Sequence, residues 1–238
     1  MAKLFNNIRK KLVADKPSTA RSANYLKYAI GEIILVMIGI LLALQINNWN
    51  ETKKMNKWEQ RFLIDLKSEL KSNLLQLEKV DTGQRRVGNT CIKLKVLMKT
   101  ATIKDKSKID SMYSLTIFQT TFFPTTGVYD SGLSAGKIEN LNNNKLKYTI
   151  MNLYNHFYKR LVYNGEILDK TIGNIDLDRD KYYDRTSRKL KSWEDIKNPE
   201  FTLKLDYLQA RNKEYTFLSQ QNLVEIKSLI NLVSDELN

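Results

Sequence analysis

One carboxylate, Glu32, lies in a segment that is otherwise apolar from Ala29 to Leu44, with Gln45 at its far end on another helical face. Charged side chains are rare in membrane segments, and those that occur usually have a function. Three roles are open to Glu32. It can reach the headgroups, lie in a contact between two membrane helices, or belong to a pathway for ions or protons.

The other residue types that could do chemistry are few. The only histidine, His156, stands among aromatic residues in YNHFYKR, and the only cysteine, Cys91, stands in CIKLKVLM. One histidine and one cysteine do not make a zinc site, so we interpret His156 as a packed or surface residue and Cys91 as a small buried one. There is no phosphate-binding glycine loop, nucleophile elbow or dinucleotide fingerprint. The sequence therefore predicts a protein that is not an enzyme, with no cofactor and no catalytic residue.

The acidic repeat Asp176-x-Asp178-x-Asp180 opens like a calcium-binding loop. Its sixth position is Lys181 instead of glycine, and its twelfth is Ser187 instead of the glutamate that binds the ion through both oxygens. We therefore predict a solvated, acidic end of a helix and no metal site.

The segment that holds Glu32 predicts a transmembrane helix over residues 28–49. From Ala29 to Ile46 such a helix is about 27 Å long, close to the hydrocarbon thickness of a bilayer. Tyr25, Tyr28 and Trp49 are expected at the two membrane surfaces. A buried core helix is disfavoured because no comparable apolar segment could pack on it. A cleaved signal peptide is disfavoured because no pair of small residues follows the apolar run.

The charges beside this helix predict its orientation. Residues 1–27 contain many lysines and arginines and a single acid, Asp15. The positive-inside rule then places the N-terminus in the cytoplasm and residues 50–238 outside it, in the periplasm if the chain is anchored in a bacterial inner membrane. The stretch KLFNNIRKKLV within the tail suits a helix on the membrane surface, and a disordered tail or a helix packed on a partner protein is equally compatible.

At 100° per residue, five positions of the predicted span lie within about 80° of one another. Gly39 and Ala43 form a small-xxx-small pair, which allows two membrane helices to approach closely. The sequence thus predicts a helix–helix interface within the membrane, formed by Ala29, Glu32, Val36, Gly39 and Ala43.

Residues 50–238 predict an all-α domain, an antiparallel bundle of three or four long helices. Apolar residues recur at spacings of three and four after the span, which indicates one long amphipathic helix with possible interruptions at Gly83 and Gly88. The other expected helices cover residues 89–99, 108–119, 126–135 (ending at Gly136), 143–175 and 200–237, the last capped by Asn198-Pro199.

The net charge is +13, but basic residues are scattered among acids and form no cluster. We therefore expect no nucleic-acid partner. The predicted partners are the lipid bilayer and either a second copy of the chain or another envelope protein.

Two stretches carry a resemblance to a known family. YAIGEIILVMIGILLALQINNWNE and the later FFPTTGVYDSGLSAGKIENLNNNKLKYTI are similar to the two landmarks of a bacterial family of single-span membrane proteins of unknown function. The resemblance implies an anchored, mostly helical domain outside the cytoplasm. It implies no activity, cofactor or catalytic residue.

These observations favour a single-pass envelope protein whose helical domain mediates assembly, with itself or with another envelope component. Two alternatives stay open: a helical domain that senses a ligand outside the cytoplasm, and an accessory subunit of an ion-driven membrane complex that uses Glu32.

Overall fold

The computed structural model describes the backbone of residues 18–117 and 119–238, and the side chains of these ranges from residue 26 onward. The stretch KLFNNIRKKLV, for which a helix on the membrane surface was one expectation, lies outside these residues. The chain divides into two units, residues 1–58 and residues 59–238. Helix α2, Ser18–Met98, contributes residues to both units.

The prediction of a mainly helical chain is confirmed. After α2 the elements are η1 (Ile103–Asp105), α3 (Lys106–Ser114), α4 (Gly127–Ser134), η2 (Ile138–Asn140), α5 (Asn144–Asn152), the π-helix η3 (Leu153–Tyr158), α6 (Lys159–Arg179), β1 (Tyr183–Asp184), β2 (Lys189–Leu190), η4 (Glu194–Lys197) and α7 (Pro199–Leu237). Strands β1 and β2 pair antiparallel, with Tyr183 opposite Leu190. This hairpin lies between the helices expected over residues 143–175 and 200–237, where the sequence predicted no strand.

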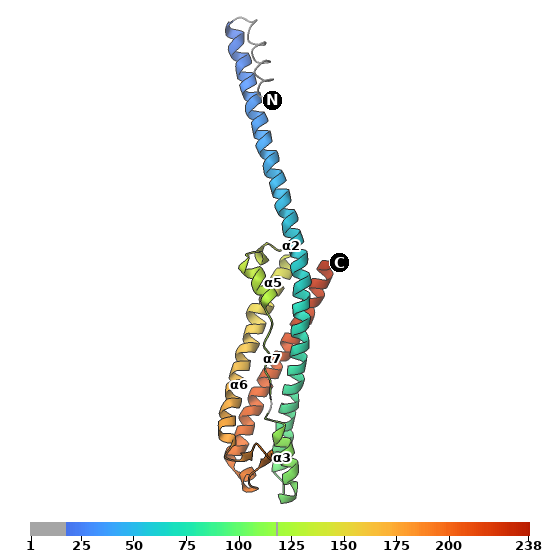
Figure 1. Cartoon of the computed structure of the whole chain (residues 1–238), viewed down its shortest axis with the longest axis vertical. Coiled ribbons are helices and arrows are strands. Elements are labelled where there is room, and N and C mark those ends of the chain that lie inside the picture. The colour runs from blue at the N-terminus through green and yellow to red at the C-terminus, as the bar shows by residue number, and fades with distance from the viewer. Residues whose placement is uncertain (1–17, 118) are drawn as a thin grey trace. The chain divides into compact units, whose positions relative to one another are not determined.

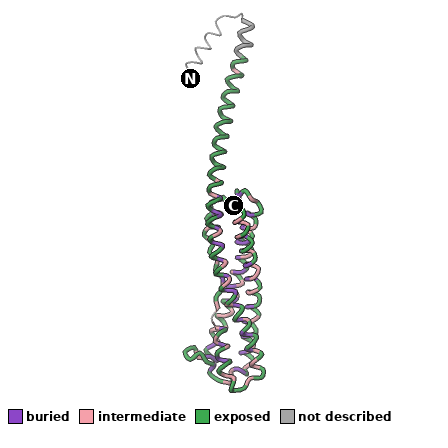
Figure 2. Tube along the Cα trace, turned by 90° about the vertical axis from the view of Figure 1, so that its right-hand side faces the viewer, coloured by how far each residue is buried: buried purple, intermediate pink, exposed green. Residues whose placement is uncertain are grey.

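Within residues 59–238, the C-terminal half of α2 runs alongside α7, and α7 packs on α6 (Figure 1). Buried positions follow the inner sides of these helices, whereas the outer sides are exposed (Figure 2). The fully covered side chains recur every three or four residues, as expected for helices with one apolar face. They include Leu66, Leu70, Leu77, Leu161, Leu168, Ile226 and Leu229.

The predicted long amphipathic helix after residue 50 is confirmed, but its expected interruption is wrong. Helix α2 passes through both Gly83 and Gly88. Gly88 serves a close approach instead, since a Cβ there would lie 2.3 Å from Oδ1 of Asn212 on α7. Gly83 has open space where its Cβ would be.

The expected helix ends are largely confirmed. The Asn198 side chain accepts a hydrogen bond from the Glu200 N–H at 2.9 Å, and Pro199 occupies the first turn of α7. Gly136 follows α4 with φ of +63°, the left-handed conformation that glycine adopts without strain. Helix α3 ends at Ser114, earlier than the predicted residue 119.

The long helix expected over residues 143–175 contains an unpredicted π-helical turn. Asn143 caps its start by accepting from the Leu146 N–H, and α5 then passes into η3 and α6. A π turn holds an additional residue and so changes which side chains face inward. Tyr154 and Tyr158 of this turn are both buried.

Residues 119–126 form neither helix nor strand, and we call them the strap. The strap includes Phe122 and Pro124, and in Figure 1 it is the loop that runs between α2 and α6. Phe122 is buried, whereas Phe123 is exposed. An extended segment leaves its backbone polar groups without ladder partners, so other groups must satisfy them.

Candidate functional site

The predicted membrane face lies on the α2 segment of the first unit. Ala29 is half-buried there, and Glu32, Val36, Gly39 and Ala43 are exposed. Nothing comes within 4 Å of the position a Cβ would take at Gly39. The helix places the five residues on one side by its periodicity, and the large apolar side chains around them are exposed in every direction. These are Leu26, Ile30, Ile33, Ile34, Leu35, Met37, Ile38, Ile40, Leu41, Leu42, Leu44 and Ile46.

The predicted interface anchors lie near the two ends of this segment. Tyr28 and Trp49 are both mostly exposed, and the Lys53 ammonium lies 5.1 Å from the centre of the Trp49 ring. The side chain of Tyr25 lies outside the described residues. Among the described residues, α2 is the helix that is long and apolar enough to cross a membrane.

In the second unit, two amide side chains of α2 hold the strap. Asn73 donates from Nδ2 to the Thr125 carbonyl and accepts from the Thr125 N–H at Oδ1, each at 2.8 Å. Gln84 donates from Nε2 to the Thr120 carbonyl at 2.8 Å. Its Oε1 accepts from Nδ2 of Asn212 on α7 at 2.6 Å. The strap is therefore fixed to α2 by side-chain amides, which bond to its backbone as a neighbouring β-strand would.

Helices α6 and α7 hold the strap from other directions. The Phe122 N–H donates to the Tyr215 hydroxyl at 2.7 Å, and burial raises the pKa of Tyr215 to about 12. Thr121 donates to Asp169 of α6 at 2.8 Å. A Cβ at Gly165 would lie within 3.4 Å of both Thr121 and Tyr215, so this glycine lets α6 pass close to the strap.

A buried carboxylate of α2, Glu69, continues the network at the end of the strap. It accepts from the Tyr154 hydroxyl at 2.6 Å and from the Val128 N–H, in the first turn of α4, at 2.8 Å. Burial, together with the hydrogen bond to this carboxylate, raises the pKa of Tyr154. Since both carboxylate oxygens are occupied, Glu69 ties the π-helix and α4 to α2.

A series of aromatic rings connects this carboxylate to the strap. Tyr129 stacks on Tyr154 with ring centres 4.2 Å apart, and Tyr158 meets Tyr154 edge-on at 5.1 Å. Phe122 of the strap meets Tyr158 edge-on at 5.5 Å. We call Glu69, Asn73, Gln84 and Tyr215, with these rings, the strap lock. Its geometry suits positioning of a chain segment, since each of its four polar side chains bonds to a backbone group of the strap or of the first turn of α4.

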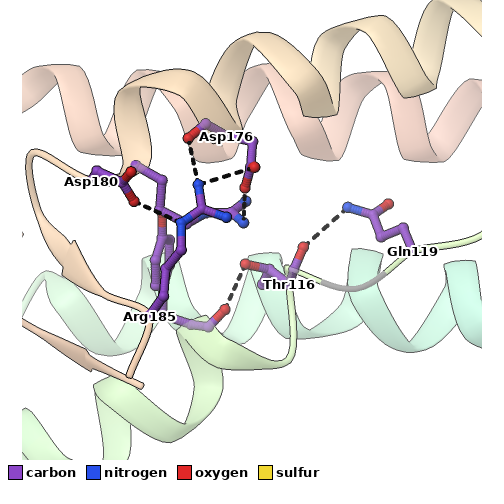
Figure 3. A network of polar contacts seen from close by, with 7 residues as sticks. Thr116, Gln119, Asp176, Asp180 and Arg185 are labelled. Carbon is purple, nitrogen blue, oxygen red and sulfur yellow. Dashed lines mark hydrogen bonds and ion pairs between the residues drawn. The ribbon is translucent and has the colours of Figure 1, made fainter. Parts of the chain in front are cut away.

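The acidic repeat lies at the end of α6 among cations (Figure 3). Arg185 contacts Asp180 at 2.7 Å and Asp176 at 3.0 Å, and Asp178 pairs with Lys181 and Lys204, each at 3.1 Å. The hydrogen bonds from Lys181 and Lys204 lower the pKa of Asp178. These carboxylates therefore make ion pairs within the protein. Across residues 26–238, leaving out 118, no three His, Cys, Asp or Glu side chains are grouped to hold a metal ion.

The single histidine and cysteine lie as interpreted from the sequence. His156 is exposed on the π-helix, with its ring edge-on to Phe157 at 5.2 Å. Cys91 is a buried free thiol, and burial raises its pKa to about 11. The thiolate that would act as a nucleophile is therefore disfavoured at neutral pH.

The strap lock was not predicted from the sequence, although a signal for it exists. Glu69, Asn73 and Gln84 are among the few polar residues on the inward face of α2, whose other buried residues are mostly apolar. A polar residue on such a face indicates a fixed partner, because a buried polar group without a hydrogen bond is costly.

Most of the strap lock and most of the apolar half of α2 fall in one region of sequence similarity. Residues 32–210 match the model of a family of unknown function, DUF6090. The chain belongs to this family. No curated protein and no solved structure matches it. The resemblance to a family of unknown function is thereby confirmed, whereas the landmark motifs and the single membrane span stay predictions.

The range that matches DUF6090 includes most of the apolar segment, the whole strap and most of the strap lock. It ends at Ala210 on α7, before Tyr215. The family match thus extends from Glu32 across both units of the chain.

Proposed function

We propose that this protein is a single-pass bacterial inner-membrane protein, without enzymatic activity, whose helical domain mediates assembly in the cell envelope. Residues 28–49 span the membrane, residues 1–27 lie in the cytoplasm, and residues 50–238 form an antiparallel helical bundle in the periplasm. The assembly partner is a second copy of the chain, through the face of Ala29, Glu32, Val36, Gly39 and Ala43.

The observation that carries this proposal is the exposure of the apolar segment on every side. Large apolar side chains from Leu26 to Trp49 stand uncovered all around α2. A helix that is apolar on every side requires an apolar surrounding, and a bilayer supplies it over a length of about 30 Å. No face of this segment is left polar enough for water.

The second domain supports a role in assembly and not in chemistry. Its buried polar groups Glu69, Asn73 and Gln84 are used to fix the strap. Its acidic repeat is used in ion pairs. These groups are therefore engaged within the domain, which supports a structural role for them.

A fusion tests the topology. A reporter that is active only outside the cytoplasm, joined after Asn238, is expected to be active, and residues 1–27 are expected to resist protease added from outside. An inactive reporter on a well-expressed protein contradicts the periplasmic assignment.

Cysteine cross-linking tests the membrane interface. In a Cys91→Ala background, Gly39→Cys is expected to form disulfide-linked dimers, because the small face lets two helices approach closely. Leu41→Cys, about 160° around the helix from Ala43, is the matched control. Equal cross-linking at both positions contradicts the interface.

A substitution at Glu32 distinguishes a role in assembly from a role in ion transport. If its role is in the interface, Glu32→Gln keeps the shape and hydrogen bonding of the side chain, so cross-linking through Gly39→Cys and the phenotype of the wild-type chain are retained. A lost phenotype with intact cross-linking instead supports the ion-pathway role.

A further inference from the structure

A groove lies between α3 and the hairpin of β1 and β2, at the end of the helical domain opposite the C-terminus (Figure 1). Its volume is about 440 Å³, which is enough for a small molecule. We call it the hairpin groove. One wall comes from α3 and the residue after it, and the other comes from the turn of the hairpin and the start of β2. The lining includes Ser111, Ser114, Leu115, Ser187, Arg188 and Lys189.

Asp110 fixes the two walls of the groove to each other. Its buried carboxylate accepts from the Leu190 N–H at 2.9 Å and from the Lys106 ammonium at 3.0 Å. The same ammonium donates to the Leu190 carbonyl at 2.7 Å. The rings of Tyr113 on α3 and Tyr183 on β1 also pack edge-on, with centres 5.3 Å apart. The groove is therefore preformed, and the negative charge of Asp110 is neutralised within the protein.

Two cations line the groove without an acidic partner. Neither Arg188 nor Lys189 forms an ion pair with a carboxylate in the part of the chain that the structure describes. Arg185, in the same turn, is different, because it contacts both Asp176 and Asp180 (Figure 3). An anion in the groove would thus meet two positive charges that the protein itself does not neutralise.

The backbone at Arg188 supports a role for its side chain. Its φ is +57°, and within the described chain it is the one residue other than glycine with a positive φ. This conformation is disfavoured for most side chains and is the usual place for glycine. Residues held in it often lie at sites that bind ligands. An arginine at this position is therefore unfavourable for the fold, and its side chain has another use.

The serine hydroxyls of the groove already donate their hydrogens within the protein. Ser111 donates to the Ser107 carbonyl at 3.0 Å, and Ser114 donates to the Ser111 carbonyl at 2.8 Å. Ser187 donates to the Asp184 carboxylate at 2.6 Å. Each hydroxyl oxygen keeps lone pairs that can accept a further hydrogen bond. A ligand that binds these serines must therefore supply several hydrogen-bond donors.

We propose that the hairpin groove binds an acidic saccharide, a sugar that carries a carboxylate. The carboxylate pairs with Lys189 and with Arg188, whose guanidinium can bind both of its oxygens. The sugar hydroxyls donate to the serine oxygens, and Leu115, which is 47% exposed, packs on the carbon face of the ring. An acidic peptide fits less well, because it presents one backbone N–H per residue whereas each sugar ring presents several hydroxyls. The groove lies wholly within residues 59–238, so this proposal does not depend on the membrane anchor or on assembly.

Calorimetric titration of the full chain, in a detergent without a sugar headgroup, tests the class of ligand. Digalacturonate, a disaccharide with two carboxylates, is expected to bind. Cellobiose, which has hydroxyls but no charge, and an end-blocked dipeptide of two aspartates are each expected to bind about tenfold more weakly, since each lacks one set of contacts. Equal binding of cellobiose overturns the role of the cations. Equal binding of the dipeptide overturns the saccharide, and absence of digalacturonate binding overturns the site.

The variant Arg188→Gly separates binding from folding. Glycine adopts the backbone conformation of residue 188 without strain, so the melting temperature is expected to rise while the affinity for digalacturonate falls about tenfold. Lys108→Ala, which removes an exposed cation of α3 outside the groove, is the matched control and is expected to leave the affinity unchanged. Equal losses in both variants report a general attraction to a basic protein and overturn the site. If Arg188→Gly instead lowers the melting temperature, Lys189→Ala decides, and an unchanged affinity of that variant overturns the proposal.

Discussion

The two halves of helix α2 have the same backbone geometry but differ in how their apolar side chains are buried. From Ile33 to Leu44 its side chains are apolar on every side and exposed. From Glu59 to Met98 they are apolar on one side only, and that side is buried against the rest of the domain. The apolar side chains of the first half need a partner or a membrane outside this domain to bury them. Those of the second half are buried by other helices of the same domain.

Polar residues on the two halves differ in the same way. In the packed half, Glu69, Asn73 and Gln84 lie on the inward face and each bonds to a backbone group of a distant segment. In the exposed half, Glu32 shares a face with Gly39 and Ala43, where no packed segment of the described chain satisfies it. An inward polar residue in the packed half thus fixes the fold, and Glu32 is left available for a partner.

The largest difference is expected for the removal of a leucine from each half. Leu66 is completely buried, so Leu66→Ala leaves a cavity and is expected to lower the free energy of unfolding by about 3–5 kcal/mol. Leu41 is 60% exposed, and Leu41→Ala is expected to leave the stability of residues 59–238 unchanged. Denaturant unfolding of the detergent-solubilised chain, followed by near-ultraviolet circular dichroism, measures both. Equal losses would contradict the division between the halves.

A smaller loss is expected when the strap is released. Asn73→Leu keeps the volume of the side chain but removes both hydrogen bonds to Thr125. The loss of stability is expected to be about 1–3 kcal/mol, because the backbone groups of Thr125 lose their protein partners. Hydrogen exchange of the Thr125 amide is expected to become faster. The increase in its rate is expected to be larger than the loss of global stability alone would cause. Gln76→Leu, at an exposed position of the same helix, is the control.

The two glycines in the packed half of α2 are expected to respond with opposite signs. Gly88→Ala places a Cβ against Asn212, which must give up its hydrogen bond to Gln84, so stability falls by about 1–2 kcal/mol. Gly83→Ala meets open space and removes the backbone entropy of a helical glycine, so stability rises by about 0.5–1 kcal/mol. Melting temperatures of the two variants decide this. Two shifts of the same sign would contradict the close approach at Gly88.

Much of the helical framework follows from local signals. Asn198-Pro199 and Gly136 are read correctly because caps depend on a few adjacent residues. The π turn at Tyr154 and the hairpin at Tyr183 are missed for the same reason. A π turn has no composition of its own, and strands of two residues are too short to show an alternating pattern.

The strap lock is missed because its contacts are not local. Asn73 and Thr125 are 52 residues apart, and Gln84 and Asn212 are 128 residues apart. The sequence shows that Asn73 and Gln84 break an apolar face, but the partner of each is fixed only when the strap and α7 pack on α2. The position of a polar anchor can thus be inferred from the periodicity, and its partner cannot.

The smallest expected effect concerns the carboxylate at which packing begins. Burial of Glu59, together with the nearby Glu236 carboxylate, raises its pKa although Asn142 donates two hydrogen bonds to it. The folded state then holds the proton of Glu59 more tightly than the unfolded state does. As the pH rises from about 4.5, the ordinary pKa of a glutamate, through the raised value, the folded state loses stability through this group.

Glu59→Gln cannot ionise, so the free energy of unfolding of this variant relative to the wild-type chain is expected to increase over that pH range. Unfolding curves of both proteins between pH 4 and about pH 7 measure the difference. A difference that stays constant with pH would mean that Glu59 is as well solvated in the folded domain as in the unfolded chain, and protein packing on α2 would then begin after it.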